Sequence, residues 1–105
     1  MSQYMVYKNS NQNSKKAYPY LLDVQSNFLE SLETRLVIPL SPLSFFQNKV
    51  IDKLTPTFRI EEKDYLLLTP QMASIKKQQL GSQVSDLSNK HHEILSSIDF
   101  LITGF

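Results

Sequence analysis

The chain carries two histidines, His91 and His92, which stand next to each other in the sequence. In a helix, adjacent side chains point about 100° apart, so this pair cannot hold one metal ion in the way that an i, i+4 pair can. We therefore expect no metal site. We expect His91 to pack on the apolar side of a helix and His92 to face solvent.

The two arginines, Arg35 and Arg59, are the candidates for recognising phosphate. Both fall in segments that read as strands. There a guanidinium can bind phosphate or RNA, or it can form a salt bridge and cover the sheet with its stem. The residues leave both uses open. The net charge of +1, from 11 basic and 10 acidic residues, argues against a strong nonspecific grip on nucleic acid.

The chain lacks the motifs of common enzyme classes. It has many serines but no G-x-S-x-G elbow, and a serine nucleophile also needs a base and an orienting group. Its two glycines, Gly81 and Gly104, cannot build a phosphate-binding loop. Cysteine is absent, which excludes disulfides and thiolate metal sites. We expect a protein that is not an enzyme and needs no cofactor.

The 105 residues are the size of one domain, which we place at residues 1–105. The opening stretch, MSQYMVYKNS, has no apolar segment after a basic start and does not read as a secretory signal. No apolar run approaches the ~20 residues of a membrane span. We expect a cytoplasmic protein with one hydrophobic core and no membrane contact.

Short stretches rich in apolar, β-branched and aromatic residues, separated by polar turns, predict an antiparallel sheet. The Asn- and Ser-rich segment Lys8–Lys16 predicts a mobile hairpin loop, and Pro19 indicates that the strand after it lies at an edge. The first three expected strands are Gln3–Tyr7, Tyr18–Val24 and Thr34–Leu40, and the third is expected to be buried on both faces. Two more strands are expected within residues 57–70, joined by a charged turn at Glu61–Lys63, and Pro70 is expected to end the second of them. A short extended piece should follow from Met72 to Ile75.

A short helical turn is expected after the third strand. Ser41 is suited to be its N-cap, and Pro42 would occupy the first helical position. We expect Phe45 and Phe46, which follow, to fill the core rather than to form a ligand platform.

The clearest element is a C-terminal helix of about five turns. Gly81 is expected to break the chain before it, Ser82 to cap it, and Gly104 to end it in the left-handed conformation. Apolar residues spaced three or four positions apart form one stripe along this helix: Val84, Leu87, Ile94, Ile98 and Leu101. Two more apolar residues, Leu95 and Ile102, widen the stripe.

The final segment, DFLITGF (Asp99–Phe105), brings apolar side chains to the end of this helix. Exposed apolar surface there would mark a site of interaction. Alternatively, the segment folds back into the core or into a dimer interface. The residues alone leave both possibilities open.

Five short segments occur here in the order and spacing found in the CcdB family. Each is weak alone, but together they span nearly the whole chain, and the chain therefore resembles CcdB, the toxin of the plasmid-borne CcdA/CcdB toxin–antitoxin system. The segments are DVQS (Asp23–Ser26), RLVIPL (Arg35–Leu40), MAS (Met72–Ser74), DLS (Asp86–Ser88) and the closing glycine–apolar pair.

The resemblance implies a mainly β fold, with an SH3-like barrel, an antiparallel sheet and a long C-terminal helix, assembled as a homodimer. It implies a type II toxin with a role in plasmid maintenance. Such a toxin binds the A subunit of DNA gyrase in its dimerisation region and traps gyrase on cleaved DNA, without itself making or breaking a bond. A CcdA-like antitoxin neutralises it, and the pair represses its own operon, with operator DNA contacted only through the antitoxin.

The resemblance also assigns residues. The best-known member has tryptophan at the position of Thr103, so Phe105 becomes the expected aromatic anchor. Leu101, on the opposite side of the helix end from Thr103, is expected to face the core or the second subunit at the dimer interface. The gyrase-contacting positions of the family fall on Asp99, Ile102, Thr103, Gly104 and Phe105, with Phe28 and Leu29 as neighbouring surface positions and Gln3, Tyr4, Tyr7 and Ser26 as further members.

Two other functions stay open. An endoribonuclease toxin of the MazF/Kid type is similar in fold and would use Arg35 or Arg59 in a basic groove, although the near-neutral charge counts against it. A non-toxic co-repressor that only binds antitoxin is the second, and Thr103 in place of the tryptophan keeps it open.

Overall fold

The computed structural model describes residues 2–46 and 52–104. Within these residues, seven strands and one α-helix are joined by short 3-10 turns. The strands are β1 (Met5–Asn9), β2 (Tyr20–Asp23), β3 (Thr34–Pro42), β4 (Thr57–Ile60), β5 (Lys63–Leu67), β6 (Ala73–Lys76) and β7 (Leu80–Asp86). The helix is α1 (His91–Thr103), and the turns are η1 (Asn27–Leu29), η2 (Leu43–Phe45), η3 (Thr69–Gln71), η4 (Lys77–Gln79) and η5 (Ser88–Lys90).

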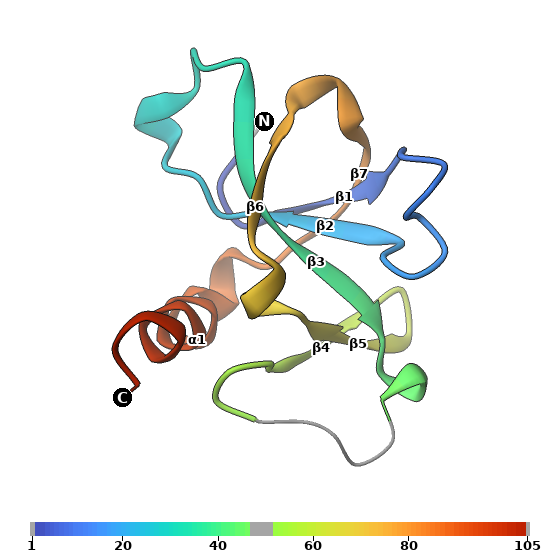
Figure 1. Cartoon of the computed structure of the whole chain (residues 1–105), viewed down its shortest axis with the longest axis vertical. Coiled ribbons are helices and arrows are strands. Elements are labelled where there is room, and N and C mark those ends of the chain that lie inside the picture. Colours follow the sequence, from blue (N-terminus) through green and yellow to red (C-terminus); the bar gives the residue numbers. More distant parts are fainter. Residues whose placement is uncertain (1, 47–51, 105) are drawn as a thin grey trace.

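The strands form one antiparallel sheet in the order β4-β5-β3-β2-β1-β7, with β6 added to β3. The long strand β3 is central, because residues 34–37 pair with β6 and residues 40–42 pair with β5. This change of partner along one strand curls the sheet into half a barrel, with α1 beside it (Figure 1). The fold is therefore mainly β, an SH3-like half-barrel with a single C-terminal helix, as the sequence predicts.

The larger of two hydrophobic core clusters lies inside the curled sheet, and α1 closes it. Ile94 of the helix is completely buried among the strand side chains, and Ile98 packs against the same cluster. β3 is buried on both faces over most of its length, as predicted. The core cluster that α1 closes contains Val6, Leu22, Val24, Ile38, Leu40, Phe58, Ile60, Tyr65, Leu67, Leu87 and Ile94.

No helix in the described residues is long and apolar enough to cross a membrane.

The first two strands pair as the predicted hairpin but begin later than predicted. Tyr4 has a φ of +69°, which is not extended, so β1 begins at Met5 rather than Gln3. β2 lies between β1 and β3, so the prediction that Pro19 marks an edge strand is wrong. Pro19 is tolerated because it precedes the strand, where its carbonyl accepts a hydrogen bond from the Asn9 backbone N–H at 3.0 Å.

The helix is shorter than predicted because β7 occupies the beginning of the expected span. Gly81 does not break the chain and Ser82 does not cap a helix, since both lie in this strand. Gly81 instead allows β7 to approach β1, and a Cβ added to it would lie 3.0 Å from the Lys8 carbonyl oxygen. Val84 belongs to the strand and Leu87 to the corner after it.

The predicted turn after β3 is present as η2, but its details differ. Ser41 is a strand residue whose hydroxyl donates to the Ala17 carbonyl at 2.6 Å, and η2 has no side-chain cap. Phe45 is 61% exposed, so the prediction that it fills the core is wrong. Because β3 runs on to Pro42, the turn lies past the end of the core. Phe46 is half-buried. The charged turn between β4 and β5 and the extended piece at β6 are as predicted.

Candidate functional site

The loop between β2 and β3 presents a group of exposed apolar side chains. Phe28 is 99% exposed, and Leu29 and Leu32 are each 47% exposed. We call these three residues the loop patch. Ser26 shapes the loop, because its hydroxyl accepts a hydrogen bond from the Phe28 backbone N–H at 3.2 Å and so caps η1. Apolar surface gathered in this way is typical of a site that binds a partner.

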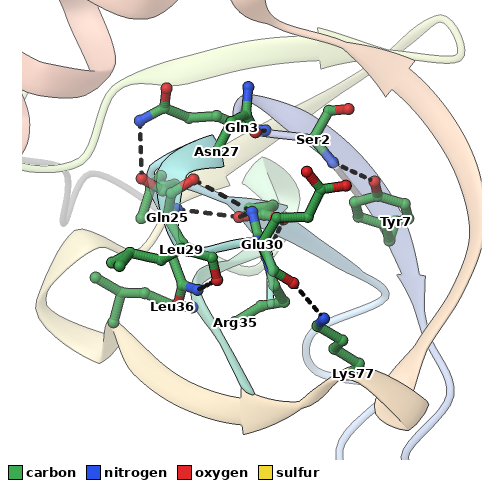
Figure 2. Close-up of polar contacts among 12 residues, drawn as sticks. Ser2, Gln3, Tyr7, Gln25, Asn27, Leu29, Glu30, Arg35, Leu36 and Lys77 are labelled. Carbon is green, nitrogen blue, oxygen red and sulfur yellow. Dashed lines mark hydrogen bonds and ion pairs between the residues drawn. The ribbon is translucent and has the colours of Figure 1, made fainter. Parts of the chain in front are cut away.

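The N-terminal segment lies against this loop. The Gln3 backbone N–H donates to the Asn27 side-chain carbonyl at 3.0 Å, and the Gln3 side-chain amide donates to the Val24 carbonyl at 3.1 Å (Figure 2). Two predicted contact residues that are far apart in the sequence, Gln3 and Ser26, are thus brought to the same part of the molecule by the strand β2 and the turn η1.

Tyr4 is held in a strained backbone conformation beside the same strand. A φ of +69° is an outlier for a bulky residue and costs about 1–3 kcal/mol, so it persists only where the surroundings enforce it. The Tyr4 N–H donates to the Asp23 carbonyl at 2.6 Å, and its carbonyl accepts from the Leu87 N–H at 2.8 Å. Tyr7 is only 5% exposed, and its hydroxyl accepts a hydrogen bond from the Ser2 N–H at 3.1 Å.

A buried ion pair lies beneath the loop. Arg35 Nε is 2.8 Å from Asp23 Oδ2 and its Nη2 is 3.0 Å from Oδ1, so the guanidinium and the carboxylate make a two-point contact with both side chains fully buried. Arg35 is therefore a salt-bridge residue, and its use for phosphate or RNA contact is excluded by its burial. Arg59 is exposed and lies 3.5 Å from the Asp64 carboxylate.

The end of α1 presents a second exposed surface, which we call the helix-end patch: Asp99, Ile102, Thr103 and Gly104. Ile102 is 72% exposed, and the other three are also exposed. The Thr103 hydroxyl donates to the Asp99 carbonyl at 2.7 Å. Phe105, the expected aromatic anchor, lies outside the described residues.

Gly104 ends the helix as predicted. Its φ is +79°, in the left-handed region, and its N–H donates to the Phe100 carbonyl at 2.9 Å. Leu101 is 38% exposed, so it does not enter the core of its own chain. Its location at an interface with a second subunit stays a prediction.

The loop patch and the helix-end patch are separate surfaces. In Figure 1 the η1 loop (cyan) lies at the upper left near the N-terminus, while the end of α1 (red) lies well below it at the lower left. The predicted contact residues therefore form two groups within one chain rather than one continuous site.

The histidines lie at the start of α1. The rings of His91 and His92 are 4.2 Å apart, and His91 is also 5.9 Å from the ring of Tyr4. His91 is half-buried, with its Nδ1 2.8 Å from the Ser88 carbonyl oxygen, while His92 is exposed. Across residues 2–46 and 52–104, no group of three or more potential metal ligands comes together.

The segments that carry the resemblance occupy defined places in this fold: DVQS leads from β2 into the loop patch, RLVIPL lies within β3, MAS leads into β6, and DLS connects the end of β7 to η5, before α1. The chain matches the family described as CcdB protein over residues 3–104 of its 105 residues. The chain belongs to the CcdB family. As a CcdB-family protein it is a toxin of a toxin–antitoxin system, with an antitoxin as its partner.

Two features of this CcdB-family surface were not predicted from the sequence. Leu32 adds to the loop patch, yet nothing in the pattern SLET distinguishes an exposed leucine from a core one. Gln25 lies buried under the loop, and the only signal was its place in the segment DVQS, which identified the family without giving the glutamine a role.

Proposed function

We propose that this chain is a gyrase poison: it binds the A subunit of DNA gyrase in its dimerisation region and traps the enzyme on cleaved DNA. The observation that carries the proposal is the exposure of Phe28 and Ile102, which are 99% and 72% accessible at positions where the family resemblance places gyrase contacts. Large apolar side chains left open to water in this way are suited to become anchors in a partner's pockets.

The poison acts by binding alone. A ligand moves an equilibrium only by its unequal affinity for the two states, so the toxin has to bind the DNA-cleaved state of gyrase more tightly than the resealed one. The side chains offered at the two patches are apolar or hydroxylic, apart from Asp99, which fits recognition of a protein surface better than catalysis.

The functional unit is a homodimer. Leu101 is the proposed interface residue, and an interface on this part of α1 would place two helix-end patches side by side for one gyrase dimer. A CcdA-like antitoxin neutralises the toxin, and the toxin–antitoxin pair represses the operon, with DNA contacted through the antitoxin. The toxin acts in the cytoplasm, where gyrase works.

The test is a DNA supercoiling and DNA-cleavage assay with purified gyrase. We expect the full chain to inhibit supercoiling and to accumulate cleaved DNA. A version that ends at Thr103 and the variant Phe28→Ser are expected to lose this effect. Phe45→Ser is the matched control, because Phe45 is an exposed phenylalanine outside both patches, and this variant is expected to keep full activity.

Other outcomes separate the remaining functions. If the full chain leaves gyrase unaffected and cleaves RNA, the endoribonuclease function replaces the proposal. If it affects neither gyrase nor RNA but binds the antitoxin, the chain is a non-toxic co-repressor. If Phe28→Ser and Phe45→Ser lost activity equally, the loop patch would not be a specific contact for gyrase.

A further inference from the structure

The loop between β2 and β3 has no apolar anchor of its own. Every residue from Asn27 to Glu33 is exposed, and none of the side chains in η1 is buried. Hydrophobic burial therefore cannot fix the direction in which this loop holds Phe28. Its conformation depends on hydrogen bonds, and most exposed hydrogen bonds contribute little because water competes for both partners.

One buried side chain reaches the loop from below. Gln25, which is 8% exposed, donates from Nε2 to the Leu29 carbonyl and to the Thr34 carbonyl, each at 3.1 Å. Its Oε1 accepts from the Leu36 backbone N–H at 2.9 Å. The amide thus joins the end of η1 to two residues of β3, and Figure 2 shows Gln25 together with Leu29 and Leu36.

The orientation of Gln25 is set by the ion pair beside it. Asp23 Oδ1 accepts from the Gln25 backbone N–H at 3.0 Å, and Arg35 Nη2 donates to the Gln25 backbone carbonyl at 3.2 Å. Both backbone polar groups of Gln25 are therefore held by fully buried, charged side chains. Hydrogen bonds to charged groups are among the strongest in proteins.

The other side-chain hydrogen bonds to the loop are exposed. Asn27 accepts from the Gln3 backbone N–H at 3.0 Å, and the Lys77 ammonium donates to the Glu30 carbonyl (Figure 2). The link through Gln25 is the one that comes from a buried side chain, so water replaces it less easily than the exposed links.

We propose that Gln25 is a positioning residue: its side-chain amide, oriented by the Asp23–Arg35 ion pair, holds the β2–β3 loop in the conformation that presents Phe28 and Leu29 to the protein partner. The inference rests on the proposed function for the identity of the partner, gyrase A, and on the hydrogen bonds above for the positioning. Preorganising a loop improves affinity because less conformational freedom is lost on binding.

The first experiment measures the loop without any partner. In ¹⁵N relaxation of the full-length protein, Gln25→Met is expected to lower the order of the Phe28 and Leu29 amides while leaving the turn between β4 and β5 unchanged. Lys77→Met, which removes an exposed link, is the matched control and is expected to change these amides little. Unchanged loop amides in a folded Gln25→Met protein would overturn the proposal.

The second experiment separates positioning from general damage. If the loop of Gln25→Met is correctly placed about one tenth of the time, the Kd for the gyrase A dimerisation region rises about tenfold. In a Phe28→Ser/Leu29→Ser background the same substitution is expected to have almost no further effect, because Gln25 acts through these two side chains. A tenfold loss that persists in that background would mean that Gln25 supports the fold only, and would overturn the proposal.

A measurement on the unmodified protein covers the case in which Gln25→Met does not fold. The Gln25 side-chain NH₂ is expected to exchange with solvent at least about tenfold more slowly than that of the exposed Gln78, because it is buried and donates twice. Equal exchange rates would overturn the proposal. Should the unmodified chain fail to bind gyrase A, the proposed function fails, while relaxation and exchange still decide whether Gln25 positions the loop.

Discussion

The hydroxyl of Thr69 donates a hydrogen bond to the hydroxyl of Ser97 at 3.1 Å, and both residues are fully buried. Thr69 begins η3, directly after β5, whereas Ser97 lies in the middle of α1. Ser97 also donates to the Ile94 carbonyl at 2.7 Å, so its hydroxyl is used as both acceptor and donor. This pair fixes the helix, and with it the helix-end patch, against the sheet.

Breaking this pair is expected to destabilise the protein. Ser97→Ala leaves the Thr69 hydroxyl buried without that acceptor, which should lower the free energy of unfolding by about 1–3 kcal/mol. Thr69→Val removes the donor with little change in shape. The double variant should cost less than the sum of the single variants, because they share one interaction. Urea unfolding of all four proteins measures the coupling, and strictly additive losses would show that the two hydroxyls do not interact.

Because β7 lies close to β1 at Gly81, we expect a side chain at this position to lower the free energy of unfolding. Gly81→Ala would place a Cβ 3.0 Å from the Lys8 carbonyl oxygen and 3.1 Å from the Lys8 Cβ, so Lys8 has to shift by a few tenths of an ångström. Overpacking of this kind costs about 1–3 kcal/mol in unfolding free energy. Ser82→Ala is the control, because Ser82 is an exposed strand residue rather than a helix cap. A loss of about 1 kcal/mol in Ser82→Ala, as expected for a cap, would contradict this assignment.

The error at the start of the helix has a physical cause. Val84 and Leu87 are three positions apart, which suits one face of a helix, but the same residues also lie at a strand and at the corner after it. Only the long-range pairing of β1 with β7 decides between them, and this pairing is not local information. Gly104 could be predicted because its requirement is local: one residue with positive φ at a helix end.

The candidate site was predictable to a similar extent. The resemblance assigned gyrase contacts to Phe28, Ile102 and their neighbours. The structure shows that these two side chains are exposed, and their contact with gyrase stays a prediction. It did not indicate that they form two patches, because that depends on how the sheet curls. The outward position of Phe45 was missed for a related reason: hydrophobicity gives the tendency of a residue to be buried, whereas its place beyond the end of β3 leaves it exposed.

Stability at high pH should depend on Tyr20. Burial raises the pKa of this phenol from 10.0 to about 12, and the nearby Tyr65, whose ring centroid lies 5.0 Å away, adds to the shift. Because the folded-state pKa lies above the unfolded one, the contribution to stability is complete below pH 10 and is lost as the pH rises towards 12.

The unfolding free energy of the wild type and of Tyr20→Phe should therefore be compared across this window. The wild type is expected to lose stability more steeply with rising pH than the variant. Tyr65→Phe removes the neighbouring phenol and should bring the pKa of Tyr20 part of the way back, which absorbance of the phenolate can follow. Identical pH dependence of the wild type and Tyr20→Phe would contradict the raised pKa.

The proposed dimer interface is tested at Leu101. Leu101→Asp would put a charge into an apolar interface and is expected to convert the dimer into monomers in sedimentation velocity. Leu95→Asp is the matched control, because Leu95 is a leucine of the same helix with a similar exposure, 42% against 38%, on a different face. Dimers that survive Leu101→Asp, or dissociate equally in both variants, would place the interface elsewhere.

The end of α1 depends on the backbone conformation of Gly104. A Cβ at this position would meet no atom within 4 Å, so any effect of Gly104→Ala has to come from the φ of +79°. The left-handed conformation costs an L-residue roughly 1–2 kcal/mol, and this strain is relieved when the hydrogen bond from the residue 104 amide to the Phe100 carbonyl opens. Hydrogen exchange of that amide should become about 5 to 30 times faster in Gly104→Ala, since this factor corresponds to the same free energy.

The control is D-alanine at position 104, introduced by peptide ligation. It adds the same methyl group but favours positive φ, so it should keep the slow exchange of the glycine. If L-alanine and D-alanine accelerated exchange equally, the methyl group itself would be the cause and conformation would not explain why glycine ends this helix.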